Sequence, residues 1–216
     1  PLLINTGYLK LDHVHEKLKN NELDEDSILL APTLSSMLID FNLDEYLDPI
    51  IKEILDNSDF KIIYRPHPVD KVNPKKSLAI NSIYEKYKNN KNFSFDYNTS
   101  YIESYKKSKI LITDFSGTAY TYAFSKLKSI IFFSKNENNL INSNFNDLYF
   151  FKDRLRVGKI VQNIDNLNEE IYSVDKNIEF YSNQINLLRS ERIKFFKNSI
   201  EQNILSLKNI LNVEKK

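Results

Sequence analysis

The sequence lacks cysteine and tryptophan, and it has only three glycines among 216 residues. Without cysteine, disulfide bonds and thiolate metal sites are excluded, and a cytoplasmic location fits. No apolar run approaches the roughly 20 residues that a membrane-spanning helix needs. Because glycine is so scarce, we expect each one to mark a tight turn or a close backbone approach. The three positions are Gly7, Gly117 and Gly158.

Charge of neither sign dominates the chain. It has 30 lysines and arginines against 29 aspartates and glutamates, which gives a formal net charge of +1. This balance provides no general attraction for nucleic acid, so we expect no nucleic-acid partner. Hydrophobic residues make up 41% of the chain, which is long enough to bury a substantial core. Composition therefore indicates an ordinary globular protein.

Short apolar runs alternate with helical patterns along most of the chain. The runs are apolar throughout, which is typical of buried parallel strands; they cover residues 27–31, 60–64, 109–113 and 129–133, with a weaker candidate at 92–96. Amphipathic or buried helices are expected at 43–55, 77–89, 99–107, 118–125 and 164–174. The alternation predicts an α/β fold, a Rossmann-like open parallel sheet with flanking helices.

The end of the chain has a different pattern. From about residue 180 to 211 the spacing is helical, and neither proline nor glycine interrupts it. We therefore predict one long C-terminal helix. The predicted organisation is a Rossmann-like domain over residues 1–178 and a helical extension over 179–216 that packs on it.

The strand at 60–64 is followed by the sequence RPHP. Pro66 and Pro68 favour extended backbone at Arg65 and His67, which places these two side chains toward the same side. Arginine offers phosphate a two-pronged donor, and histidine offers a hydrogen bond or a proton for a leaving group. The simpler alternative is a loop histidine held by prolines, with Arg65 in a surface ion pair.

The strand at 109–113 leads into the sequence TDFSGTAY. Ser116 is a natural cap for a helix that begins near Thr118, and the start of a helix attracts anions. Gly117 would let a phosphate approach the backbone, and both hydroxyls could add hydrogen bonds. Asp114 would repel phosphate, so we expect it to orient a hydroxyl or a backbone amide, or to contact a neutral polar group of the ligand. A capped buried helix without a ligand is the alternative.

The order of the motifs is more specific than any one of them. It resembles the CDP-glycerol glycerophosphotransferase family, which includes teichoic-acid polymerases and capsule-polysaccharide transferases, over residues 5 to about 165. The motifs are G-Y-x-x-x-D from Gly7 to Asp12, A-P-T from Ala31 to Thr33, R-P-H-P at 65–68, T-D-x-S at 113–116 and V-G-K-I-V at 157–161. In one respect the chain departs from the family: Gly117 stands where relatives usually have a second serine.

The resemblance implies the nucleotide-donor half of a GT-B enzyme. Arg65 and His67 would contact the donor pyrophosphate, and His67 would help CMP to leave. The residues that would line or support the donor site are Thr33, Thr113, Asp114, Ser116, Gly117, Thr118, Gly158 and Lys159. Of these, Gly158 and Lys159 would belong to a late glycine-containing loop that approaches the nucleotide. No metal and no cofactor are implied, because the nucleotide-activated donor is itself the substrate.

The resemblance also implies a reaction and partners. A CDP-activated alditol, such as CDP-glycerol, would transfer its alditol phosphate to a polysaccharide or lipid-linked acceptor, at the inner face of the cell membrane. The acceptor site would lie in an N-terminal domain missing from this chain, so the chain alone should bind donor weakly and catalyse little. Two alternatives stay open: a GT-B glycosyltransferase that uses a CMP- or UDP-sugar for capsule or lipopolysaccharide, and, less favoured, a flavodoxin-like binding module.

Overall fold

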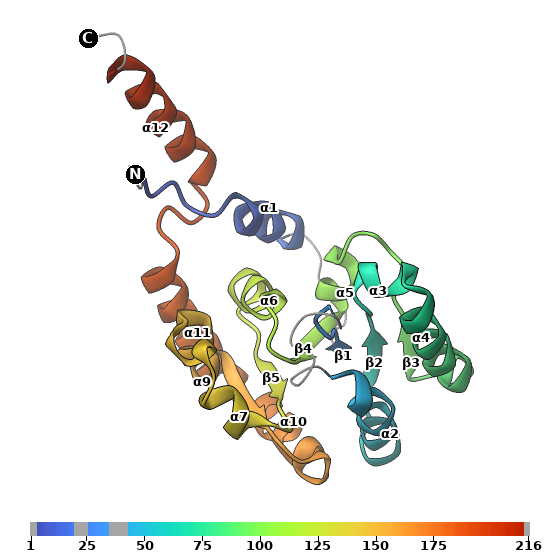
Figure 1. The fold of residues 1–216 in the computed structure, drawn as a ribbon. Helices are drawn as coiled ribbons and strands as arrows, with labels where there is room; N and C mark the ends of the chain where they lie inside the picture. Colours follow the sequence, from blue (N-terminus) through green and yellow to red (C-terminus); the bar gives the residue numbers. More distant parts are fainter. Residues whose placement is uncertain (1–3, 20–25, 35–42, 214–216) are drawn as a thin grey trace.

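A single parallel sheet organises the molecule. The computed structural model describes residues 4–19, 26–34 and 43–213. The strands are β1 (Ser27–Leu30), β2 (Lys61–Tyr64), β3 (Phe93–Phe95), β4 (Ser108–Thr113), β5 (Ile130–Phe133) and β6 (Gly158–Val161). Their order is β3-β2-β1-β4-β5-β6, and every pairing is parallel (Figure 1). The predicted Rossmann-like fold is confirmed, and the order reverses between β1 and β4, where such sheets bind ligands.

Helices cover both faces of the sheet (Figure 1). One layer contains α2 (Leu47–Asn57), α4 (Pro74–Tyr87) and α10 (Leu167–Lys176). The other contains α1 (Leu9–Leu18), α5 (Ile102–Lys107), α6 (Thr118–Lys126) and α11 (Ile178–Arg192). Shorter helices connect these elements; they are α3 (Pro68–Val72), α7 (Glu137–Ile141), α8 (Tyr149–Lys152) and α9 (Arg154–Val157). Within the described residues, no helix is both long and apolar enough to cross a bilayer.

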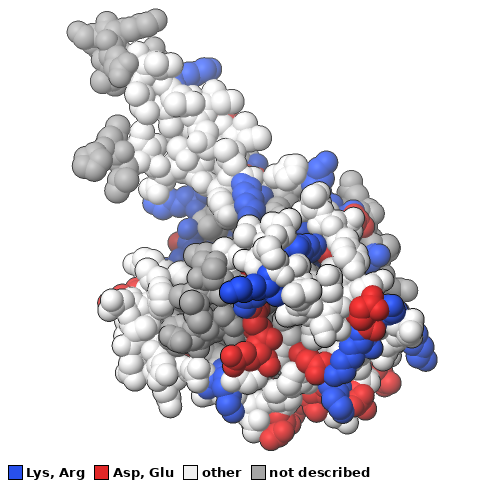
Figure 2. All heavy atoms as spheres, turned by 45° about the vertical axis from the view of Figure 1, so that its right-hand side comes forward, with Lys and Arg blue, Asp and Glu red and all other residues white. Residues whose placement is uncertain are grey.

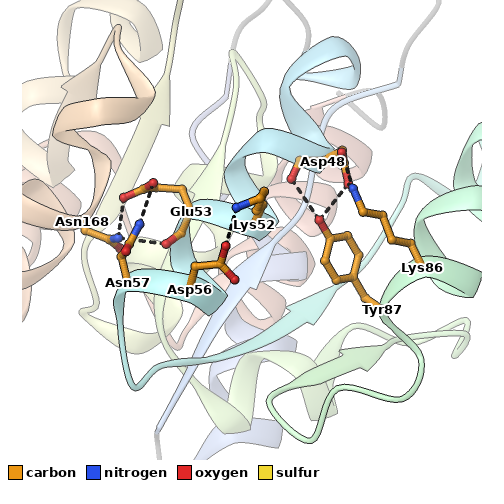
Figure 3. Close-up of polar contacts among 8 residues, drawn as sticks. All are labelled: Asp48, Lys52, Glu53, Asp56, Asn57, Lys86, Tyr87 and Asn168. Atoms are coloured by element: carbon orange, nitrogen blue, oxygen red, sulfur yellow. Dashed lines mark hydrogen bonds and ion pairs between the residues drawn. The ribbon is translucent and has the colours of Figure 1, made fainter.

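Helix α2 illustrates how the layers are held. Its buried residues are Leu47, Ile50, Ile51 and Ile54, the stripe that its spacing predicts. Its polar side bonds to both neighbouring helices (Figure 3). Asp48 accepts hydrogen bonds from Lys86 at 2.6 Å and from Tyr87 at 2.7 Å, both on α4. Glu53 accepts from Asn168 of α10 at 2.8 Å. Burial of its apolar side and hydrogen bonds to α4 and α10 therefore together hold α2 in place.

The predicted long C-terminal helix is wrong in one respect, because the chain breaks it into two. Helix α11 ends at Arg192, and α12 (Ser199–Val213) begins seven residues later. In the connection, Phe195 and Lys197 adopt positive φ angles of 56° and 72°, which continuous helix does not allow. The helical spacing is the same on both sides of the break, so periodicity alone gave no sign of it.

The break depends on a residue from the other end of the chain. The two carboxylate oxygens of Asp12, on α1, accept the backbone N–H groups of Lys197 at 2.8 Å and Ser199 at 2.9 Å. These contacts satisfy amides at the start of α12 and set its direction. Gly7 is part of the same junction: its φ is +84°, and a Cβ there would lie 2.3 Å from the Ser199 hydroxyl. The G-Y-x-x-x-D motif is thus explained by the start of α12.

The two C-terminal helices differ in how they pack. Helix α11 joins the layer beside α6 and buries Tyr181, Ile185 and Leu188. Helix α12 projects away from the sheet (Figure 1) and has an exposed apolar side. The exposed residues are Ile200, Ile204, Leu205, Leu207 and Leu211. Residues 214–216 of the predicted extension lie outside the described residues.

Candidate functional site

The chain segments that follow β1, β2, β3 and β4 lie at one edge of the sheet, where parallel strands have their carboxyl ends. Four predicted residues are at least partly exposed there: Thr33, His67, Gly117 and Thr118. Four others are buried beneath them: Arg65, Thr113, Asp114 and Ser116. The structure thus brings eight of the ten predicted site residues to one edge and sorts them into an accessible and a supporting group.

Asp114 is the acidic residue of the supporting group. Its carboxylate is almost fully buried and accepts backbone N–H groups from Thr33 at 3.0 Å and from Leu43 at 3.1 Å. It therefore holds the two ends of the connection that follows β1. Burial raises the pKa of Asp114 to about 7, although the two amides act in the opposite direction. Beside it, the buried Thr113 hydroxyl donates to the Ala31 carbonyl at 2.6 Å.

The first backbone amides of α6 are hydrogen-bonded within the chain. The Ser116 hydroxyl accepts the Thr118 N–H at 3.3 Å, and the Ser116 carbonyl accepts the Ala119 N–H at 3.2 Å. Both amides thus have partners within the chain, so an anion here would meet the Thr118 hydroxyl, the exposed Gly117 peptide and the positive end of the helix dipole.

Gly117 does not meet the expectation of a tight turn or a close contact, and this is a correction. Its φ is −64°, which any residue adopts, and a Cβ there would meet nothing within 4 Å. Its peptide is exposed. The fold itself therefore gives no reason for glycine at this position.

Arg65 is separated from His67, contrary to the expectation that both face one ligand. Its guanidinium is buried, forms an ion pair with Asp96, and donates to the carbonyls of Asn98 and Thr99, each at 3.0 Å. The fork that could have bound phosphate is thus engaged within the protein. Arg65 holds the segment that follows β3 against the end of β2.

Asp96 is the residue that the sequence interpretation missed. It also accepts the Ser104 hydroxyl and the Asn98 N–H, the latter at 2.8 Å. Burial acts to raise the pKa of Asp96, but the hydrogen bonds and Arg65 outweigh it and hold that pKa below its ordinary value. The signal was present, because Asp96 ends the weak strand candidate at 92–96 and thus occupies a strand end.

His67 is the half-exposed member of the RPHP motif. Its Nδ1 accepts the N–H of Val69 at 3.3 Å, so the imidazole caps the short helix α3. When one nitrogen of a neutral imidazole accepts, the other carries the proton. The Nε2–H is therefore the donor that His67 can offer a ligand at this edge.

Gly158 and Lys159 are not at this edge, which corrects the expectation of a late glycine loop. They begin β6, at the amino end of the strand, and the sequence GKIV forms an edge strand. A Cβ on Gly158 would lie 1.7 Å from the Ile130 carbonyl oxygen, so glycine permits close contact with β5. The Lys159 ammonium pairs with Glu170 and bonds to Ser173, both on α10.

Metal binding finds no support in the part of the chain that the structure describes, because no group of three or more histidines, aspartates and glutamates gathers there. The pair His13 and His15 lies on α1. His15 contacts the Ser125 carbonyl through Nδ1 at 3.2 Å, and burial lowers its pKa.

The sequence matches a known protein family over most of its length. Residues 2–207 match the family described as CDP-Glycerol:Poly(glycerophosphate) glycerophosphotransferase. The chain belongs to this family. No curated protein matches the sequence.

Solved structures show the same fold at low identity. The wall teichoic acid polymerase TagF is 22% identical with a TM-score of 0.54, covering 95% of this chain and 47% of its own. A TagF variant soaked with CDPG gives 22% identity and a TM-score of 0.52, covering 95% and 46%. The UDP-GlcNAc 2-epimerase of Methanocaldococcus jannaschii, in complex with UDP-GlcNAc and UDP, gives 20% and 0.58, covering 94% and 54%. The chain thus spans about half the length of these proteins.

Proposed function

We propose that this chain is the donor-binding part of a transferase that moves glycerol phosphate, or a similar alditol phosphate, from a CDP-activated donor to a polymer acceptor. The family supports this reaction class. The observation that carries the assignment of the site is Gly117, an exposed glycine that the fold does not need, next to the Thr118 hydroxyl at the start of α6. A phosphate close to this backbone would explain the missing side chain.

The proposed chemistry is a substitution at phosphorus. An oxygen of the acceptor hydroxyl attacks the β-phosphorus of the donor, the bond from that phosphorus to the bridging oxygen breaks, CMP leaves with the electron pair, and the hydroxyl proton is released to water. His67 donates its Nε2–H to the departing phosphate, while the start of α6 stabilises the charge. Arg65, Asp96 and Asp114 act beneath the site as positioning residues.

Helix α12 supports a second part of the proposal, that the acceptor-binding half of the enzyme packs against this chain. Ile200, Ile204, Leu207 and Leu211 recur at helical spacing on one exposed side. Figure 2 shows that this projecting part of the surface is largely uncharged. An apolar stripe of this kind is typical of an interface. The complete enzyme would act at the cytoplasmic face of the membrane, where lipid-linked acceptors are extended.

Calorimetric titration of the chain with CDP, CMP and UDP tests the donor assignment. The cytidine nucleotides should bind more tightly than UDP, by about tenfold, or 1.4 kcal/mol. Gly117→Val should abolish binding of all three without lowering the melting temperature, because the space around this position is open. Equal affinity for UDP would favour a sugar-nucleotide transferase instead, and unchanged affinity of the Gly117→Val variant would remove α6 from the site.

His67→Asn separates catalysis from capping. Asparagine is a good helix cap, so the start of α3 should be preserved while the imidazole Nε2–H, the hydrogen-bond donor to the departing phosphate, is lost. We expect turnover by the full-length enzyme to fall by about 100-fold or more, with an unchanged melting temperature. Turnover assays with CDP-glycerol provide the measurement. Wild-type turnover by the variant would exclude His67 from the reaction.

A further inference from the structure

A pocket between α2 and α4 opens beside His67. It has a volume of about 270 Å³ and extends from the ends of β1 and β2 toward the two helices. Pro32, Pro66 and His67 are among the residues that line it, so it adjoins the proposed donor site. Neither the phosphate chemistry proposed above nor the packing of the core uses this space.

The walls of the pocket combine two kinds of surface. Leu47, Tyr64, Ile80 and Ile83 provide apolar walls. Around them, the described charged residues are Asp44, Glu45, Asp48, Asp70 and Lys76. Asp44 pairs with Lys76 at 2.6 Å, and Asp48 is bonded to Lys86 and Tyr87, so these carboxylates are fixed in position (Figure 3).

This combination selects against anions. Among the described residues that line the pocket, four carboxylates face the one ammonium group of Lys76, and the balance stays negative when Lys86, paired with Asp48, is included, so a phosphate would be repelled. A neutral polyol suits the same walls, because its C–H groups can pack on the apolar residues and its hydroxyls can donate to carboxylate oxygens. The volume accommodates a single alditol or sugar unit.

We propose that the pocket binds a neutral polyol unit of the substrate, with the phosphates outside it at His67 and α6. This inference rests on the proposed function. The polyol has two possible sources, the alditol of the donor or the terminal unit of the acceptor. In either case the pocket selects the size of the unit, while the nucleotide is bound elsewhere.

Filling the pocket tests the inference. Ala79 lines the pocket from α4 and is exposed, so Ala79→Phe should occupy the space without disturbing the fold. Leu78→Phe is the matched control, because Leu78 is its exposed neighbour on the same helix and does not line the pocket. Glu45→Gln, a smaller change on the exposed rim, keeps the volume and removes one carboxylate.

The readout is the affinity of the full-length enzyme for CDP, for CDP-glycerol and for a glycerol-phosphate oligomer. Ala79→Phe should leave CDP binding unchanged. If the donor supplies the polyol, the variant should lose the advantage of CDP-glycerol over CDP; if the acceptor supplies it, the oligomer should bind about tenfold more weakly. Glu45→Gln should weaken the same ligand less, and Leu78→Phe should change neither. Unaltered affinity of Ala79→Phe for both ligands would overturn the inference.

A measurement without nucleotide separates this inference from the donor proposal. Titration of the chain with glycerol, followed by NMR, should shift the signals of Ile80 and Ile83 in the wild type and in Leu78→Phe, but not in Ala79→Phe. Such shifts would support a polyol pocket even if CDP and UDP bound equally well. Absence of shifts in the wild type would contradict the pocket assignment even if cytidine preference were found.

Discussion

At the scale of single residues, burial decides which predicted site residues can touch a ligand. His67, Gly117 and Thr118 are accessible, whereas Arg65 and Asp114 have buried partners of their own. The residue types at the strand ends predicted polar chemistry at this edge. They could not reveal the division of labour, because exposure depends on neighbours from elsewhere in the chain.

Asp114 gives a prediction on pH. Its pKa is raised from 3.8 in the folded protein, so between about pH 4 and pH 7 the folded state holds a proton that the unfolded chain has released. The contribution of Asp114 to the free energy of unfolding is therefore fully present below about pH 4 and is lost as the pH rises through about 7. Relative to Asp114→Asn, the wild type should lose unfolding free energy across this window and then level off.

Denaturant unfolding of both proteins at pH 4, 5, 6, 7 and 8 provides the measurement. Taking the difference between them cancels groups that titrate alike in the two proteins. A flat difference would show that the hydrogen bonds from Thr33 and Leu43 cancel the effect of burial on the Asp114 pKa, and a difference that increases with pH would show that they outweigh it.

At the scale of elements, the strands and the larger helices followed from periodicity, and the exceptions have physical causes. Strand β6 was hidden because its sequence, GKIV, is short and contains a glycine. The break before α12 was hidden because it is imposed by Asp12, 187 residues before Ser199. Local pattern reports which face of an element is apolar, but it carries no information about such distant contacts.

Arg65 connects the ends of β2 and β3, and its replacement should affect stability. Arg65→Met would leave Asp96 buried without its guanidinium partner, and we expect a loss of about 3–5 kcal/mol of unfolding free energy. Lys71→Met is the control, since the Lys71 ammonium donates to the Asp96 carbonyl from a more exposed position and should cost less than about 1 kcal/mol. Chemical denaturation measures both.

The same pair of variants distinguishes the two possible roles of Arg65. If the arginine contacted donor phosphate, Arg65→Met would weaken CDP binding while leaving stability unchanged. The geometry predicts the opposite result. Arg65→Met should lower the melting temperature, and it should weaken CDP binding only to the extent that the segment after β3 becomes disordered.

At the scale of the whole molecule, the main feature of α12 is that its apolar side is exposed. Ile200 and Leu207 are more than half exposed, at 66% and 58%. Burying such a side chain yields about 1.5–3 kcal/mol, which is gained only if another surface covers it. We propose that the acceptor-binding half of the enzyme covers this exposed stripe.

Charge on this stripe should damage the complete enzyme but not the chain alone. We expect Ile200→Asp with Ile204→Asp to lower the melting temperature of the full-length protein by about 5 °C or more, and that of the chain alone by less than about 1 °C. Gln202→Asp with Asn209→Asp adds the same two charges on the opposite side of α12 and serves as the control. Thermal unfolding of both lengths checks this, and equal effects in the two would place the stripe outside any interface.

The carboxylate of Asp12 couples the two ends of the chain. Because α12 begins on two oxygens supplied by α1, a cut that removed the first dozen residues would act most strongly at the opposite terminus, between Ile193 and Asn198. A residue near the beginning of the chain is thus part of the junction that positions its last helix. Boundaries chosen for a shortened version of this protein have to keep Asp12 and Ser199 together, since either one alone leaves the direction of α12 unset.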